Sequence, residues 1–293
     1  MNGVLLVNKP QKFTSFDVVA KLRGILKTKK IGHGGTLDPM ATGVLPVFVG
    51  AATGACDLVP DTDKTYIAGL RLGVVTDTQD IWGKVTQTSA HKVTVNQFAS
   101  VAGRFVGDIM QIPPMYSAVK VDGKRLYEHA RRGEVVERPA RAVTIHSLRI
   151  QCADEPGGEY TIEVSCSKGT YIRTLCADIG DMLGCGAAMT SLVRTCSMGF
   201  PLDRCLTLEQ IGHRAQRGVI DEILIPTERL FLGLPALHLN DEQTRLFLNG
   251  VKLSVDLSDT GDVRIYGQEG GFIGLGYIEA KSGKLRVRKF FKN

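Results

Sequence analysis

One carboxylate in the sequence stands in a loop whose composition restricts its shape. Residues 32–46 (GHGGTLDPMATGVLP) place Asp38 among four glycines and two prolines. Glycine opens backbone conformations that other residues avoid and proline fixes φ, so such a loop presents a side chain in a defined direction. Pro39 also biases Asp38 toward extended backbone. On this pattern alone two interpretations are equally good: a functional carboxylate, or an Asx-turn in which Asp38 satisfies its own backbone.

Composition bounds the class of protein. The chain has 293 residues and is 43% apolar, enough for one large domain or two. No apolar run approaches the ~18 residues of a membrane span, and no basic region precedes a long apolar stretch as in a secretory signal. The seven cysteines include no C-x-x-C pair, which disfavours a disulfide framework or a zinc cluster. We therefore expect a reduced, cytoplasmic protein.

The charge distribution points toward a polyanionic partner. The net charge is +6, with a pI near 8.9. Basic residues gather in three clusters: Lys27, Lys29 and Lys30; Lys120, Lys124, Arg125, Arg131 and Arg132; and Lys284, Arg286, Arg288, Lys289 and Lys292. Each cluster alone is more often a solvated face than a binding site. Together, in a mildly basic chain, they favour nucleic acid.

The Asp38 loop also belongs to an ordered set of motifs. The others are residues 2–10 (NGVLLVNKP), 63–66 (DKTY), 72–80 (LGVVTDTQD), 112–127 (IPPMYSAVKVDGKRLY) and 166–175 (CSKGTYIRTL). In this order, covering most of residues 2–196, they resemble the TruB family, the bacterial tRNA pseudouridine-55 synthases. Any one block could arise by chance, but the ordered set is very specific.

The resemblance implies a reaction and three principal residues. Pseudouridine formation cuts the N1–C1′ bond of uridine, turns the base and joins C5 to C1′, so neither cofactor nor metal is needed. The resemblance makes Asp38 the nucleophile. Arg173 matches the arginine that pairs with it, and a guanidinium favours and orients an ionised carboxylate. Tyr66 matches the tyrosine that stacks on the flipped target base. Without the resemblance, Tyr66 would be taken as an ordinary core tyrosine.

Five further site residues follow from the same resemblance. His33 matches a histidine that helps the target arm adopt its flipped conformation, although loop packing would explain it too. Asp80 matches an acidic-loop residue near the base, and Lys9 a lysine near the active site. Leu192 and Arg194 match a motif that lines the pocket, where core packing explains Leu192 equally well. The family more often has a larger residue, such as threonine, at position 34, which is glycine here.

Local patterns predict the elements that position these residues. Thr14 and Asp17 form a potential capping box for a helix that ends near Thr28. Alternation predicts a strand over 65–73, and Gly184 ends a helix that begins at Tyr171. A turn at Asp122 and Gly123 is predicted between a strand at 116–121 and a helix at 124–132. Further strands are expected at 3–7, 44–49, 142–151, 159–167 and 189–199, with helices at 94–106 and 207–217.

The composition changes around 226–236, where Pro226, Gly233 and Pro235 mark a boundary. We therefore predict a pseudouridine synthase catalytic domain over 1–230 and a second domain over 235–293. The second is basic, β-rich and small for an independent core. Its position resembles that of the family's PUA-like RNA-binding domain.

We accordingly expect an α+β catalytic domain with a largely antiparallel central sheet, followed by a small β-rich PUA-like domain. The expected function is isomerisation of a uridine in the tRNA T-loop, position 55, by a monomeric cytoplasmic enzyme without a cofactor, a metal or a membrane partner. A hydrolytic glycosidase is disfavoured, because it usually needs a paired acid and base. One alternative is a non-catalytic RNA-binding protein or tRNA-folding chaperone on the same scaffold; another is a synthase acting on a different RNA.

Overall fold

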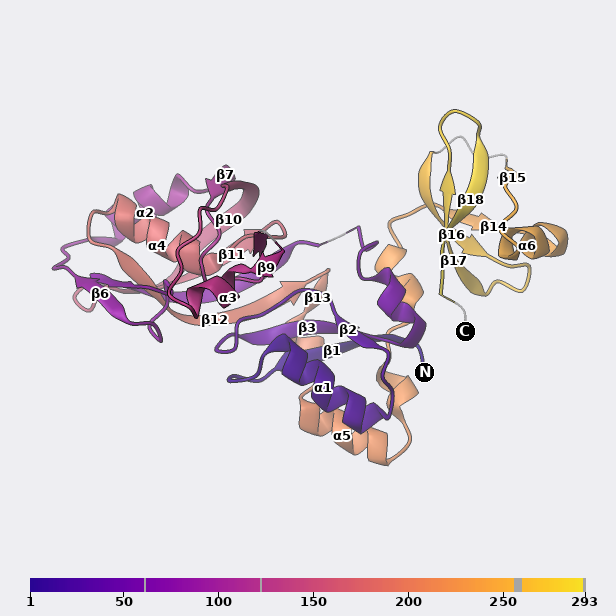
Figure 1. Ribbon diagram of the computed structural model, residues 1–293, viewed down its shortest axis with the longest axis horizontal. Helices are drawn as coiled ribbons and strands as arrows, with labels where there is room; N and C mark the ends of the chain where they lie inside the picture. The colour runs from indigo at the N-terminus through magenta and orange to yellow at the C-terminus, as the bar shows by residue number, and fades with distance from the viewer. Residues whose placement is uncertain (61, 122, 256–259, 292–293) are drawn as a thin grey trace.

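The chain folds around two sheets, one large and one small. The computed structural model describes residues 1–60, 62–121, 123–255 and 260–291. Within them, a nine-stranded sheet forms the body of the molecule and a five-stranded sheet stands at one end (Figure 1). No helix in these ranges is both long and apolar enough to cross a membrane.

The large sheet is antiparallel apart from one strand pair. Its strand order is β1 (Gly3–Lys9), β3 (Thr42–Val49), β12 (Ala187–Ser197), β4 (Lys64–Leu72), β11 (Glu159–Cys166), β10 (Arg141–Asp154) and β7 (Gly107–Gln111), with β2 (Ile31–His33) beside β3 and β13 (Phe200–Pro201) beside β12. Only β3 and β12 run parallel among these pairs. The predicted α+β class with a largely antiparallel sheet is confirmed.

The parallel pair brings the end of the Asp38 loop against the middle of the sheet. Gly43 lies opposite Arg194, with φ +103°. A Cβ at Gly43 would stand 2.2 Å from the Arg194 carbonyl oxygen, so only glycine allows this approach. Arg194 is in turn the cross-strand partner of Tyr66 on β4. The register therefore places the Asp38 loop, Arg194 and Tyr66 next to one another.

Helices cover the two halves of this sheet. Helix α1 (Ser15–Leu26) and helix α5 (Leu208–Gln216) pack with β1 and β3, while α2 (Val95–Gly103) and α4 (Ile172–Met182) pack on the half built from β4 and β11. The Thr14–Asp17 capping box is present, with the Asp17 amide 3.0 Å from Thr14 Oγ1. Gly184 follows α4 in a left-handed conformation, as the sequence predicts.

The prediction for residues 116–132 is right for the helix and wrong for most of the strand. Of the predicted strand, β8 (Lys120–Val121) is present and pairs with β9 (Lys124–Arg125), and helix α3 (Leu126–Ala130) begins after that hairpin, two residues later than predicted. The reason lies in residues 117–119: the carbonyls of Ser117 and Val119 accept the Tyr127 and Leu126 amides, so this stretch caps a helix instead of joining a sheet. Gly123 has the φ of +80° expected in the predicted turn, whereas Asp122 lies outside the described residues.

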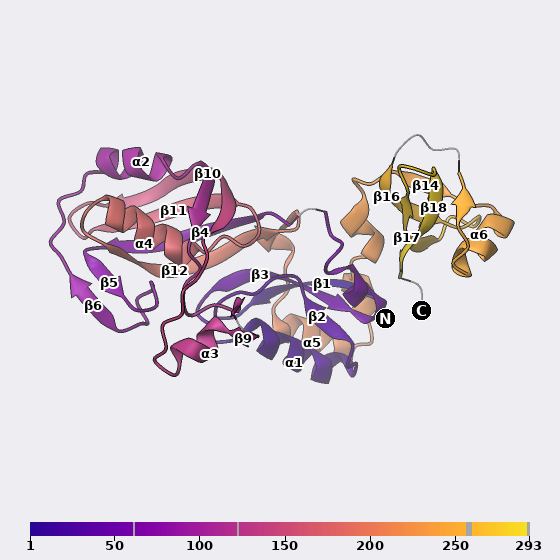
Figure 2. The ribbon, with the colours of Figure 1, turned by 45° about the horizontal axis from the view of Figure 1, so that its top comes forward.

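The remaining elements are short. They are the hairpin of β5 (Val74–Thr76) with β6 (Val85–Thr88), and the 3₁₀ turns η1 (Gly50–Ala55), η2 (Leu202–Arg204), η3 (Ile220–Ile223) and η4 (Thr227–Phe231). In both ribbon views, β9 and α3 lie between α4 and α1 (Figure 2).

The C-terminal sheet is small and shares part of its core with the body. It contains β14 (Ala236–His238), β16 (Gly261–Tyr266), β17 (Phe272–Ile278), β18 (Lys284–Phe290) and β15 (Leu253–Ser254), with α6 (Asp241–Leu248) packed beside it. Phe231 stacks on Phe291 with ring centroids 5.7 Å apart, and Leu275 joins the same cluster as Val4 and Phe48. The division into 1–230 and 235–293 stays a prediction, and an apolar cluster spans the predicted boundary.

Candidate active site

A cavity of about 460 Å³ opens where the Asp38 loop, β4, β12 and the start of α4 meet. Asp38, Tyr66, Arg173 and Leu192 all line it. Chain segments far apart in sequence therefore bring four of the predicted site residues to one cavity. The other four predicted site residues do not line this cavity in the described structure; they are Lys9, His33, Asp80 and Arg194.

Arg173 grips the Asp38 carboxylate by both oxygens. Its Nε lies 2.8 Å from Asp38 Oδ2, and its Nη2 lies 3.2 Å from Oδ1. The arginine side chain is 5% exposed and the aspartate 39% exposed. A bidentate pair of this kind fixes the plane of the carboxylate while leaving it open to the cavity. The hydrogen bonds to this carboxylate in the described structure come from Arg173, which disfavours the Asx-turn alternative.

Arg173 is itself held by backbone carbonyls, which accounts for its buried charge. Nη2 donates to the Tyr116 carbonyl at 2.9 Å, and Nη1 donates to the Thr78 carbonyl at 3.1 Å. Asp80 Oδ2 stands 4.0 Å from Nη1. A buried guanidinium is stable when its remaining donors are satisfied in this way. Asp80 therefore neighbours Arg173 at the limit of ion-pair distance, and its other oxygen accepts the amide of Trp82 at 3.1 Å.

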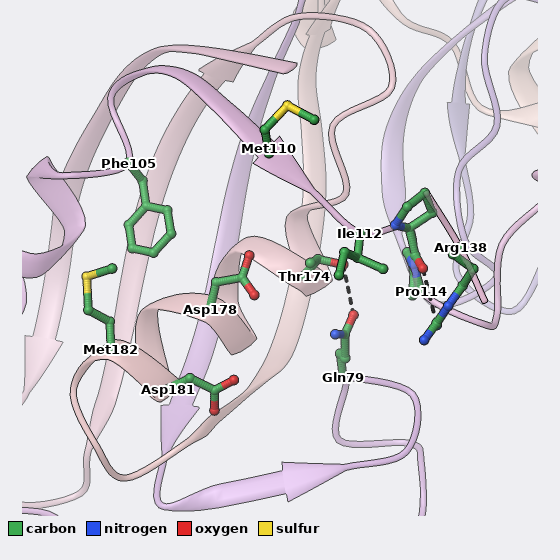
Figure 3. A pocket seen from close by; sticks show the side chains of 11 residues that line it. Gln79, Phe105, Met110, Ile112, Pro114, Arg138, Thr174, Asp178, Asp181 and Met182 are labelled. Carbon is green, nitrogen blue, oxygen red and sulfur yellow. Dashed lines mark hydrogen bonds between the residues drawn. The ribbon is translucent and has the colours of Figure 1, made fainter. Parts of the chain in front are cut away.

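Hydrogen bonds from Arg173 and Thr174 of α4 hold the acidic loop, the turn of residues 77–80 that follows β5. Next to the Arg173 bond to Thr78, the Thr174 hydroxyl donates to Gln79 Oε1 at 2.9 Å. Figure 3 shows this bond at the edge of a second cavity, of about 620 Å³, on whose wall Asp178 and Asp181 of α4 also lie. Burial and the Asp181 charge raise the pKa of Asp178 to about 6. The turn after β5 is thus pinned beside the active-site arginine.

Tyr66 offers an aromatic surface to the Asp38 cavity. It is 6% exposed, and Leu192 lines the same cavity from the neighbouring strand. Burial raises the pKa of Tyr66, and the nearby Arg194 guanidinium offsets part of that rise. The hydroxyl therefore stays protonated at neutral pH. A planar base that entered the cavity would meet an aromatic ring and an aliphatic side chain.

Lys9 and Arg194 lie behind the cavity, in the core. Both are fully buried. The Lys9 ammonium donates to the carbonyls of Phe13 and Pro39, at 2.5 and 3.2 Å. Burial lowers the pKa of Lys9 to about 8, partly opposed by the Asp38 charge. The position of both side chains indicates support of the loop backbone and no direct contact with a bound base.

His33 is the last residue of β2 and precedes by two residues Gly35, where the loop begins to line the cavity. It is half-buried, and burial lowers the pKa of its imidazole. The neighbouring Gly34 is closely packed: a Cβ there would stand 2.7 Å from Met198 Cε and 2.9 Å from the Phe48 ring, so both side chains would have to shift to admit a larger residue. Glycine at this position, where the family more often has a larger residue, is therefore matched by local packing.

Several residues of the site escaped the sequence reasoning. Lys64, Arg141 and Lys168 line the Asp38 cavity and bring positive charge to it. Lys64 and Lys168 belong to motifs that the sequence analysis singles out, so a search for cations beside the named residues would have found them. Ser15 was also missed: its buried hydroxyl accepts the Leu37 amide at 2.9 Å and anchors the loop.

Three family models match consecutive parts of the chain, and all three describe pseudouridylate synthases. Residues 23–172 match the model "TruB family pseudouridylate synthase (N terminal domain)", 173–232 match "tRNA pseudouridylate synthase B C-terminal domain", and 235–289 match "Pseudouridine synthase II TruB, C-terminal". The tRNA pseudouridine synthase B of Lachnoclostridium phytofermentans is 44% identical, over 99% of this chain and 100% of that protein. The protein of the same name from Clostridium tetani is 44% identical over 94% and 95%.

A solved structure shares the fold. The "Crystal Structure of a Cbf5-Nop10-Gar1 Complex" superposes with a TM-score of 0.75 at 26% identity, covering 99% of this chain and 85% of that chain. Family models, relatives and fold therefore lead to one conclusion: the chain belongs to the TruB family of pseudouridylate synthases.

Proposed function

We propose that this protein isomerises a uridine of tRNA to pseudouridine, and that the uridine is the one at position 55 in the T-loop. The main observation behind this proposal is the Asp38 carboxylate, which Arg173 holds in one plane in a cavity that Tyr66 also lines. The names of its relatives support the same reaction.

The reaction rearranges one molecule and needs no group from outside it. The N1–C1′ bond breaks, the detached base turns, C5 bonds to C1′, and the proton on C5 is lost while N1 gains one. Asp38 is the nucleophile or base that starts this sequence: attack at C1′, attack at C6 and removal of the C2′ proton each need one ionised carboxylate. Arg173 holds that carboxylate ready, and Tyr66 and Leu192 form the surface against which the base can turn.

An RNA substrate fits the electrostatics of the cavity. Lys64, Arg141 and Lys168 line it, and these cations suit the phosphates that flank a flipped nucleotide. A protein that only bound RNA would gain nothing from a carboxylate 39% exposed at the same place, since it repels phosphate. We therefore prefer the enzyme to the non-catalytic RNA-binding protein or chaperone.

We also propose that the enzyme works as a monomer in the cytoplasm. The Asp38 loop, β4, β12 and α4 of a single chain build the cavity. The cysteines at positions 56, 152, 166, 176, 185 and 205 are free thiols, as expected in a reducing compartment.

The decisive experiment incubates the protein with an unmodified tRNA transcript and maps pseudouridine along it. We expect conversion at position 55 with the wild-type protein and none with Asp38→Asn, which should still bind tRNA because it loses no cation. Conversion at another uridine would overturn the T-loop assignment. Tight binding without conversion by the wild-type protein would favour the chaperone, and turnover by Asp38→Asn would remove the role of the carboxylate.

A further inference from the structure

A buried arginine connects the two strands of the parallel pair to the Asp38 loop. The Arg194 side chain is completely inaccessible to solvent. Its Nε donates to the Val44 carbonyl of β3 at 2.7 Å. Its two terminal nitrogens approach the loop, with Nη2 3.2 Å from the Gly35 carbonyl and Nη1 3.4 Å from that of Thr36. One planar group thus spans the strand after the loop and the backbone before Asp38.

The energetics of this arrangement set Arg194 apart from an ordinary core residue. Within the described ranges, no carboxylate lies within ion-pair distance of its guanidinium, which faces three backbone carbonyls and interacts with the Tyr66 side chain. Burial of a charge in this way is costly compared with an apolar side chain of the same size. An apolar residue would fill the volume but could not hold three carbonyls in place. A buried arginine at this position therefore fixes the backbone carbonyls around it, and the protein is less stable than it would be with a well-packed apolar side chain there.

The loop is restrained on both sides of Asp38. Arg194 holds Gly35 and Thr36, the Ser15 hydroxyl holds the Leu37 amide, and Lys9 holds the Pro39 carbonyl at 3.2 Å. Gly35, Thr36 and Leu37 line the cavity together with Asp38, whose carboxylate is the group that pairs with Arg173. Fixing the backbone on either side leaves the carboxylate little freedom except the position that Arg173 selects.

We infer that Arg194 is a positioning residue for the proposed isomerisation: it contacts no substrate atom, and it sets the place of Asp38 through the carbonyls of Gly35 and Thr36. This inference rests on the proposed function. It moves Arg194 from the pocket lining, where the sequence motif suggests it, to a layer beneath the loop. A misplacement of about 1 Å can reduce a rate ~100-fold, so the effect on turnover is expected to be large.

The test compares Arg194→Lys with Arg264→Lys. Arg264 is the control, because its Nε likewise donates to a carbonyl, that of Leu234 at 2.9 Å, and its Nη1 to the Tyr266 hydroxyl at 2.8 Å, in the C-terminal sheet. It differs from Arg194 in having a carboxylate, that of Glu228, 3.8 Å away. Three quantities are measured for each: the melting temperature, the tRNA Kd, and the single-turnover rate at saturating tRNA. Hydrogen exchange of the amides in residues 34–42 reports the loop itself.

Both variants should melt at a lower temperature than the wild-type protein. Only Arg194→Lys should lose single-turnover rate, by roughly 10- to 100-fold, with the Kd unchanged and faster exchange at the Leu37 amide. Arg194→Gln, which keeps planar N–H donors without the charge, should recover part of the protection of the loop relative to Arg194→Met.

Wild-type rate and wild-type loop exchange in folded Arg194→Lys would overturn the inference. If no Arg194 variant folds where Arg264→Lys does, the arginine is required for the fold itself and the inference is again overturned. Should the wild-type protein form no pseudouridine, the proposed function fails alone, because loop exchange still decides whether Arg194 holds the loop.

Discussion

Replacing Arg173 with lysine tests how much the reaction depends on the orientation of the Asp38 carboxylate. The guanidinium contacts both carboxylate oxygens, at 2.8 and 3.2 Å, and two carbonyls, at 2.9 and 3.1 Å. An ammonium keeps the charge but is a compact donor that cannot match both oxygens in one plane. The substitution therefore separates the charge from the geometry.

The expected loss follows from the contacts removed. One charge-assisted hydrogen bond to Asp38 is worth about 1.5–3 kcal/mol, which corresponds to roughly 10- to 150-fold in rate if it acts in the transition state. Because Asp38 is 39% exposed, solvent screening places the expectation in the lower half of that range. Leaving the Thr78 or the Tyr116 carbonyl unpaired costs a further ~1–3 kcal/mol of unfolding free energy, which affects stability and not the rate per folded molecule.

The assay is single-turnover pseudouridine formation at saturating tRNA, with denaturant unfolding measured in parallel. Arg214→Lys is the control. Arg214 is 41% exposed and its one ion pair in the described structure, with Glu222, is long at 3.9 Å, so neither the turnover rate nor the unfolding free energy should change. A wild-type rate in Arg173→Lys would refute the reasoning and leave Arg173 as a source of charge alone. An unchanged unfolding free energy would show that its carbonyl contacts are replaced without cost.

Three other predictions follow from the same structure. Tyr66→Leu should turn over more slowly than Tyr66→Phe by the ~1–3 kcal/mol of base stacking, and equal measurable single-turnover rates would rule stacking out. Lys284→Gln should lower the slope of log affinity against log salt by about one unit or slightly less, and Arg288→Gln by less, because Arg288 already lies 3.5 Å from Asp262; equal effects, compared on the same tRNA, would contradict this. The pKa of Asp178 is raised from 3.8 to about 6, so the cost of its ionisation to folding grows as the pH rises between these values and is complete above pH 6. Asp178→Asn should therefore raise the melting temperature at pH 8 and raise it much less near pH 4, and the same shift at both would exclude titration as its cause.

The C-terminal sheet shows why truncation is a poor test of RNA binding here. Removing the chain after Leu234 would take away Leu275 and Phe291, which pack in one cluster with Phe231 and Phe48. Such a truncation is expected to destabilise the body of the protein as well as to remove basic residues. Arg286 and Arg288 also have acidic neighbours, so the described part of the cluster offers fewer unpaired charges than its sequence suggests. Lys292 lies outside the described residues.

The sequence predicted elements well where the decisive partners are close along the chain. Thr14 and Asp17 are three residues apart, and their predicted capping box is present at the start of α1. The helix predicted at 94–106 likewise begins with a capping box, formed by Thr94 and Gln97. The predicted strand fails at residues 116–119, where the carbonyls of Ser117 and Val119 cap α3. Any residue type has a carbonyl, so a pattern of side chains cannot reveal that use. The two strands of the hairpin that precedes the helix, β8 and β9, have two residues each, which is likewise too short for periodicity to detect.

The same distinction separates what could be foreseen of the site from what could not. Asp38 could be identified as a candidate site residue because the glycines and prolines around it indicate a loop of defined shape. Its partner Arg173 stands 135 residues away, and only the order of the strands brings the two together. Arg194 shows the limit most clearly, because its motif suggests a wall of the pocket while the register with Tyr66 and Gly43 turns its guanidinium to the underside of the loop. Which face a strand residue serves depends on its neighbours in the sheet, so a motif can identify a residue of the site without revealing whether it meets the substrate or holds the residue that does.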